Sequence, residues 1–167
     1  MVHLAFKHST DTGPWHARLL DKIISARSNG DAVHVELVFS DGVSFSASQW
    51  DKGVRFKQID YTGDSKWVLV PVHITAEQEA TVRNVAEVLA QMGIKYDWRG
   101  ILGFFIGKRN PGDLDKLFCS EACVTVLKYA GVFTHLTPST TDPWLLECVA
   151  VERNNCLGPG PESPACS

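Results

Sequence analysis

Residues 33–48, with the sequence VHVELVFSDGVSFSAS, contain two alternating segments joined by a short polar turn. Apolar side chains occupy the odd positions of both segments, which is the pattern of strands that bury one face. The joining residues 40–42 (Ser-Asp-Gly) fit a three-residue hairpin loop with glycine in the left-handed conformation. Such a loop pairs Leu37 with Phe45, whereas a two-residue loop would mix the two faces of the sheet. We therefore predict an antiparallel hairpin in this register.

The same register gathers polar side chains on the second face of the hairpin. It places Glu36 opposite Ser46 and His34 opposite Ser48. Polar groups gathered in this way indicate a cleft wall rather than an ordinary surface facing solvent.

Further elements are predicted on both sides of the hairpin. Strands are expected at residues 2–6, 53–59 and 66–72, and helices at residues 14–27, 76–92, 97–106 and 120–130. Thr75 and Gln78 fit a capping box at the start of the second of these helices, and Gly93 follows its end. After residue 151 the composition changes to Asn, Gly, Pro and Ser. We therefore predict one α+β domain over residues 1–151 and a Pro/Gly-rich tail over residues 152–167.

Composition excludes several classes of function. A chain of 167 residues with 44% hydrophobic residues can form one globular domain with a substantial core. Its formal net charge of −3 and lack of a basic run argue against a nucleic-acid partner. The N-terminus lacks the pattern of a signal peptide, and no apolar run is long enough for a transmembrane segment.

The five cysteines are odd in number and irregularly spaced, which argues against a disulfide framework. Cys119 and Cys123 could share a metal ion, but no further ligand lies nearby in the sequence and zinc sites favour closer pairs. We therefore expect neither a metal nor a cofactor. Cys123 and Cys148 are predicted to be small buried residues, and Cys156 and Cys166 could pair only in an oxidising environment.

The sequence FCSE at residues 118–121 places Cys119 at the start of a predicted helix. The partial positive charge of a helix N-terminus favours the thiolate, which is the nucleophilic form of cysteine. A histidine on a neighbouring strand, such as His34, can complete a Cys–His pair whose ring is oriented by a third polar group. This pattern is typical of a cysteine hydrolase or an acyl-transfer enzyme.

Three short motifs together resemble the circularly permuted branch of the NlpC-type papain-like cysteine hydrolases, which is related to lecithin–retinol acyltransferase. They are the strand at residues 34–38 with its Asp-Gly turn, KYDWRG at residues 95–100, and FCSE at residues 118–121. Unpermuted members place the cysteine helix before the histidine strand, and here the order is reversed. The resemblance extends over about residues 2–150. It implies a papain-like fold in circularly permuted order, with an antiparallel sheet packed against helices.

The resemblance also implies roles for individual residues. Cys119 matches the nucleophile, His34 the general base, and Tyr96 the tyrosine that lies beside the nucleophile and helps the oxyanion site. The third polar residue of the family aligns best with Ser46, although His, Glu, Asn or Gln is more usual there. Glu36 lies on the same predicted face as His34 and could supply a carboxylate instead, so both residues remain candidates.

Members of this family cut peptide bonds in bacterial cell walls or act on acyl-lipid amides and esters. We expect a cysteine peptidase or amidase acting on cell-wall peptide, because a small acidic chain resembles bacterial and phage-borne versions. Such a protein would reside in the bacterial cytoplasm or a phage virion and act on the cell envelope. The alternative of an acyl-lipid hydrolase or acyltransferase is favoured by the apolar run at residues 101–106. A third alternative is a structural or binding module of a larger particle, with an idle site and an assembly partner held by the tail.

Overall fold

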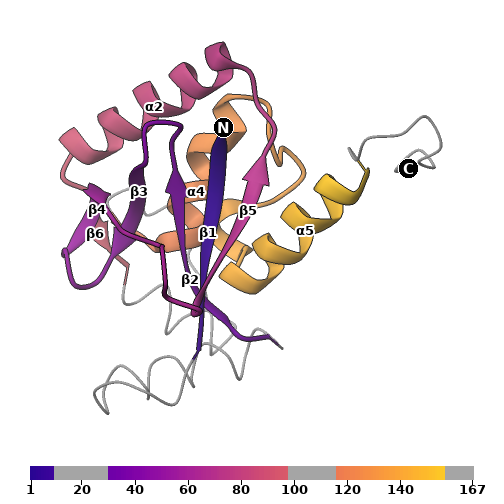
Figure 1. Ribbon diagram of the computed structural model, residues 1–167. Coiled ribbons are helices and arrows are strands. Elements are labelled where there is room, and N and C mark those ends of the chain that lie inside the picture. The colour runs from indigo at the N-terminus through magenta and orange to yellow at the C-terminus, as the bar shows by residue number, and fades with distance from the viewer. Residues whose placement is uncertain (10–29, 98–115, 157–167) are drawn as a thin grey trace.

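The computed structural model describes residues 1–9, 30–97 and 116–156, in which a seven-stranded sheet packs against three α-helices (Figure 1). The strands are β1 (Val2–His8), β2 (Ala32–Val38), β3 (Val43–Ser48), β4 (Gly53–Gln58), β5 (Trp67–Val72), β6 (Lys95–Tyr96) and β7 (Lys116–Leu117). Their order across the sheet is β5-β1-β2-β3-β4-β6-β7. Neighbouring strands are antiparallel except for β6 and β7, which run parallel. The α+β class predicted from the sequence is confirmed.

The β2–β3 hairpin has the predicted register. Leu37 pairs with Phe45, and the N–H of Gly42 donates to the Phe39 carbonyl at 2.9 Å. Gly42 has a φ of +83°, so it occupies the left-handed region that the three-residue loop requires. Toward His34 the regular ladder stops at the pair of Leu37 and Phe45, so the predicted pairing of Glu36 with Ser46 and of His34 with Ser48 does not form.

The apolar face of the sheet is covered by the helices α2 (Ala76–Gln91), α4 (Cys119–Tyr129) and α5 (Pro143–Cys156). Helix α4 packs on β2 and β3, α2 contacts α4 and β4, and α5 contacts β1, β2 and β5 (Figure 1). The core includes Leu37, Phe45, Val126 and Leu127, all fully buried. Burial of each such side chain contributes about 1.5–3 kcal/mol, so this packing fixes α4, and with it Cys119, against the strand that carries His34.

The ends of the helices test several predictions. The capping box of Thr75 and Gln78 is present at the start of α2. Helix α5 continues past the predicted domain boundary at residue 151 and ends at Cys156. Asn154 donates from Nδ2 to the carbonyl of Pro71 in β5 at 2.8 Å, which ties the last turn of α5 to the sheet. Residues 152–156 are therefore part of the folded unit and not of the tail.

Some predictions concern other parts of the chain. The helices expected at residues 14–27 and 97–106, the apolar run at 101–106 and the tail at 157–167 lie outside the described residues, as does Cys166 of the suggested Cys156–Cys166 pair. Among the three described helices, none has the length and apolar character needed to cross a membrane.

The second face of the sheet is also covered, by the segment that connects β4 to β5. Tyr61 in this segment shares a hydrogen bond of 2.8 Å with the Ser44 hydroxyl. Its ring meets the Trp67 ring edge to face at a centroid distance of 5.0 Å. Ser44, Ser46 and Glu36 are buried. Of the predicted cleft wall, His34, Glu36 and Ser48 do line a cleft, and Ser46 does not.

Candidate active site

The fold brings Cys119 and His34 together from segments that are far apart in the sequence. Cys119 is the first residue of α4, and His34 lies near the start of β2. Cys119 raises the pKa of His34 through its negative charge and a hydrogen bond, so the two side chains act on one another. Cys119 has an exposed fraction of 4%, and the His34 side chain has one of 23%. The pair therefore lies at the edge of the interior, where solvent reaches the ring.

Glu36 holds the second nitrogen of the His34 ring. Nε2 of His34 donates to Oε1 of Glu36 at 2.8 Å. Residues two apart on a strand project from the same face, so β2 alone places the carboxylate beside the ring. The contact leaves Nδ1 as the ring nitrogen for Cys119, and the hydrogen bond made by one nitrogen fixes the tautomer and orientation of the other.

Arg55, which sequence reasoning missed, holds Glu36 in turn. Its Nη1 and Nη2 atoms donate to the two carboxylate oxygens at 2.5 Å and 2.6 Å, and its Nε donates to Asp51 at 3.0 Å. Arg55 reaches Glu36 because β4 pairs Arg55 with Ser46, on the strand beside β2. Arg55 lies between the apolar Val54 and Phe56, so the alternation of β4 assigns it to the polar face of the sheet. Once β4 is paired with β3, this pattern predicts that Arg55 lies near Glu36.

These contacts set the charges of the site. Burial raises the pKa of Glu36, but hydrogen bonds from Arg55 and His34 outweigh burial, and the pKa of this carboxyl lies below its usual range. Burial lowers the pKa of His34, but Cys119 and then Glu36 outweigh it and raise the pKa to about 10. The ring is therefore positively charged at neutral pH. Arg55, Glu36 and His34 form a line of alternating charge that ends at Cys119.

Tyr96, the predicted oxyanion residue, lies beside this pair. It is the last residue of β6 and lines the same cleft as His34. Burial, followed by the negative charges of Cys119 and Asp97, raises the pKa of Tyr96. Its hydroxyl therefore keeps its proton in the physiological range and can donate a hydrogen bond.

The start of α4 provides backbone donors. The first N–H groups of any α-helix lack partners within the helix, and Phe118 at the N-cap supplies no capping side chain. Together with the helix dipole, such a terminus favours a negative group. The backbone N–H of Cys119 belongs to this first turn.

Ser46 is not brought to His34. Its hydroxyl donates to the Val35 carbonyl at 2.7 Å and is fully buried. It bridges β2 and β3 just beyond the point where their regular ladder ends. Of the two candidates for the third polar residue, the structure places Glu36 against the ring and leaves Ser46 in a structural contact.

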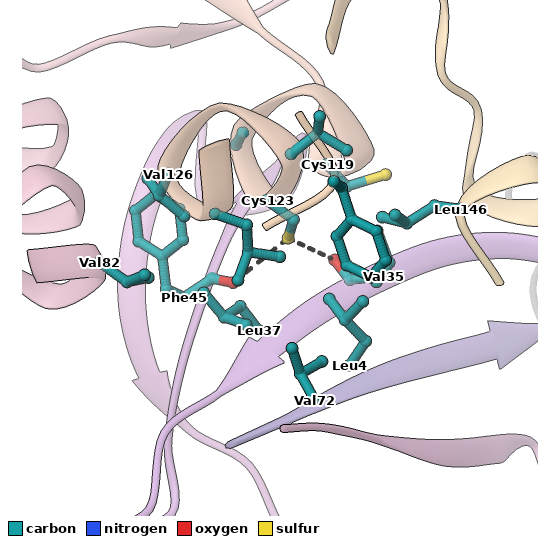
Figure 2. Packing of buried hydrophobic residues seen from close by; sticks show 14 of the residues in the cluster. Leu4, Val35, Leu37, Phe45, Val72, Val82, Cys119, Cys123, Val126 and Leu146 are labelled. Carbon is teal, nitrogen blue, oxygen red and sulfur yellow. Dashed lines mark hydrogen bonds between the residues drawn. The ribbon is translucent and has the colours of Figure 1, made fainter. Parts of the chain in front are cut away.

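Cys123, one turn further along α4, packs in the core. Its sulfur lies 4.0 Å from the Val35 carbonyl oxygen and 3.9 Å from that of Phe45. Figure 2 shows this sulfur directed at the two strands, whereas the Cys119 sulfur points away from it. Within the described ranges, no three His, Cys, Asp or Glu side chains are grouped so as to hold a metal ion. Cys148, also predicted to be buried, is exposed on α5.

A cleft of about 190 Å³ opens beside the ring of His34. The side chains that line it include Lys7, His34, Trp50, Lys57, Trp67 and Tyr96. The Trp67 ring approaches His34 edge to face with a centroid distance of 6.2 Å. His34 and Tyr96 both line the cleft and both interact electrostatically with Cys119, which links the cleft to the cysteine through these two side chains.

Comparison with protein-family models and with curated proteins identified no relative of this chain. No protein-family model matches the chain, and no curated protein matches it significantly. The chemistry of the site is therefore argued from its own residues.

Proposed function

We propose that the protein is a cysteine hydrolase of the circularly permuted papain-like type, which attacks an amide carbonyl through Cys119. The observation that carries this proposal is the relationship of three side chains. Cys119 at a helix start interacts with His34, and the other ring nitrogen of His34 is hydrogen-bonded to Glu36 at 2.8 Å. A nucleophile, a base and an orienting group in this order form the general arrangement of an activated thiol.

In this mechanism the Cys119 thiolate attacks the amide carbon and forms a tetrahedral intermediate. The protonated His34 ring then donates its proton to the leaving amine, and the C–N bond breaks to give an acyl-enzyme. The neutral ring next takes a proton from water, whose oxygen attacks the thioester carbon. Release of the carboxylic acid restores the thiolate and the protonated ring. Glu36 accepts from Nε2 throughout and keeps Nδ1 directed at the reacting atoms.

The tetrahedral intermediate carries a negative oxygen that needs donors. The backbone N–H of Cys119 and the Tyr96 hydroxyl are the candidate donors in this proposal. One oxyanion donor typically contributes about 2.7–4 kcal/mol to the stability of the transition state. The raised pKa of Tyr96 supports this role, because the hydroxyl has a proton to donate.

The order of the elements supports the permuted papain-like assignment, since the histidine strand β2 precedes the cysteine helix α4. As the substrate we propose an amide of a bacterial cell-wall peptide, with the protein acting as an endopeptidase or amidase on the cell envelope. Acyl-lipid amides and esters are the second candidate class. A structural module with an idle site is the third, and it predicts an unreactive Cys119.

The test compares two cysteines on the same helix. Purified wild type, Cys119→Ser and Cys123→Ser are assayed on muropeptides and on fluorogenic acyl amides, with circular dichroism to verify folding. We expect Cys119→Ser to lose all measurable turnover and Cys123→Ser to keep most of it. Of the two cysteines, Cys119 interacts with His34, whereas the Cys123 sulfur packs against β2 and β3. Equal loss in both variants would contradict the assignment of Cys123 to packing. Absence of turnover on both substrates, with Cys119 reacting with iodoacetamide no faster than free cysteine, would support the idle module.

A further inference from the structure

We propose that the cleft beside His34 binds a carboxylate carried by the substrate, so that the protein acts on amides with an acidic group next to the scissile bond. This inference rests on the proposed function of Cys119. It concerns Lys7 and Lys57, neither of which has a role in the chemistry described above.

The cleft carries an excess of positive charge although the chain as a whole has a net charge of −3. Among the described residues that line it, Lys7, Arg55 and Lys57 are basic, and Glu36 and Asp51 are acidic. Both acids are already engaged by Arg55, which donates to each of them. The positive ring of His34 adds to the excess. Clefts lined by one sign of charge concentrate ligands of the opposite sign.

The sheet places Lys7 next to His34. Lys7 of β1 pairs directly with His34 of β2 in the antiparallel ladder, and paired residues project from the same face with Cβ atoms about 4.5–5.5 Å apart. Lys7 has no hydrogen-bond or ion-pair partner within the described parts of the chain. Its amino group thus places a positive charge beside the ring that no carboxylate of the described residues neutralises.

Lys57 approaches the cleft from the other side. It follows Arg55 by two residues on β4, so both project from the same face of the sheet. Its amino group lies 3.4 Å from Asp51, which also accepts the shorter hydrogen bond from Arg55. The Lys57 side chain is half exposed, so this long contact leaves its remaining donors to solvent or to a ligand.

The size and walls of the cleft indicate the rest of the ligand. Its volume of about 190 Å³ is below the roughly 300–1,000 Å³ of pockets that hold drug-sized molecules. It therefore suits one residue-sized group rather than an extended acyl chain. Trp50 and Trp67 provide apolar walls, which fit the methylene carbons of an acidic side chain, while the lysines pair with its carboxylate.

The charge of the cleft is measured with two alkylating reagents of nearly equal size. Iodoacetate and iodoacetamide both react with a thiolate, which displaces iodide and forms a thioether, but only iodoacetate carries a carboxylate. The second-order rate constant for Cys119 is obtained with each reagent by mass spectrometry of the labelled peptide, and the ratio of the two constants reports the affinity for negative charge.

We expect the ratio of the iodoacetate to the iodoacetamide rate constant to be higher for Cys119 in wild type than for free cysteine. Lys7→Gln and Lys57→Gln should each lower the ratio by about fivefold, the effect of one unit charge about 4 Å from the reagent in water. Arg83→Gln is the matched control, because it removes the same charge from α2, where Arg83 pairs with Asp41 at the far end of the β2–β3 hairpin. This variant should leave the ratio unchanged.

The outcomes separate the two proposals. If Cys119 reacts rapidly but the ratio of the two rate constants does not depend on Lys7 or Lys57, the proposed carboxylate site is wrong. The assignment of Cys119 as the nucleophile is then unaffected. If neither reagent labels Cys119 faster than free cysteine, the proposed function itself fails. Protection from iodoacetamide by succinate supports a carboxylate ligand, whereas stronger protection by inorganic phosphate overturns the carboxylate in favour of a phosphate group.

Discussion

Arg55 donates two hydrogen bonds to the Glu36 carboxylate, from Nη1 at 2.5 Å and from Nη2 at 2.6 Å. Glu36 has an exposed fraction of only 1%, and a buried carboxylate is costly unless it is paired and hydrogen-bonded. The planar guanidinium matches both carboxylate oxygens and fixes the plane of the group. Arg55 therefore keeps Glu36 charged and directed at His34.

The first prediction concerns Glu36→Gln. The amide removes the negative charge that helps to keep His34 protonated, so kcat should fall by about 10²-fold, at the lower end of the contribution of a positioned acid or base. Stability should fall by up to about 3–5 kcal/mol, because buried Arg55 loses the charge of its bidentate partner and keeps only Asp51. Urea unfolding and kcat on the active substrate class measure the two effects.

A double variant separates the two effects of Glu36→Gln. Adding Arg55→Met removes the buried charge that has lost its Glu36 partner, so Glu36→Gln/Arg55→Met should recover part of the lost stability without recovering activity. Recovery of kcat in the double variant would show that Glu36 acts only by neutralising Arg55.

Arg55→Lys is the second prediction. Lysine keeps the positive charge but lacks the planar pair of donors, so Glu36 loses the geometry that fixes its plane. We expect the free energy of unfolding to fall by about 1.5–3 kcal/mol, the value of one hydrogen bond to a charged group. We also expect a lower kcat with KM nearly unchanged. A change confined to KM would place Arg55 in substrate binding instead.

Ser46→Ala provides the third prediction, which contrasts the two candidates for the third site residue. The substitution removes the hydrogen bond to the Val35 carbonyl, so stability should fall by about 1–3 kcal/mol, the cost of a buried acceptor left without its partner. Because Ser46 makes no described contact with His34, kcat should stay within about twofold of wild type. A large loss of kcat in a folded Ser46→Ala variant would show that Ser46 contributes to catalysis.

The hairpin was predictable from the sequence because its alternation and its loop length independently require the same register. The capping box at Thr75 and the position of Cys119 at a helix start are likewise local features of the chain. Each depends on residues a few positions apart, where sequence patterns act directly on backbone geometry.

The parts that could not be predicted depend on contacts between distant segments. Ser46 is a candidate because the resemblance aligns it with the third polar residue of the family, but the regular β2–β3 ladder ends before it and its hydroxyl bridges the two strands. Arg55 reaches Glu36 only through the pairing of β3 with β4. The polar composition after residue 151 suggested a tail, yet the contact of Asn154 with Pro71 extends α5.

The final prediction is the titration of His34. Cys119 and Glu36 overcome the effect of burial and raise its pKa from 6.5 to about 10, so the ring signals in an NMR titration of wild type should have a midpoint near that value. Cys119→Ser removes the charge that contributes most to the increase, and Glu36→Gln removes the next. Both variants should therefore lower the midpoint, whereas Cys123→Ser should leave it nearly unchanged.

The same shift predicts how stability depends on pH. Because the folded protein holds this proton more tightly than the unfolded chain, the contribution of His34 is fully present below about pH 6.5, the unfolded pKa, and is lost as the pH rises through about 10. The free energy of unfolding should thus decline more steeply between these values in wild type than in His34→Ala. Urea unfolding at pH 6, 8 and 10 measures the difference. Equal slopes in the two proteins, or a wild-type midpoint near 6.5, would mean that His34 is neutral at physiological pH and that leaving-group protonation must come from another donor.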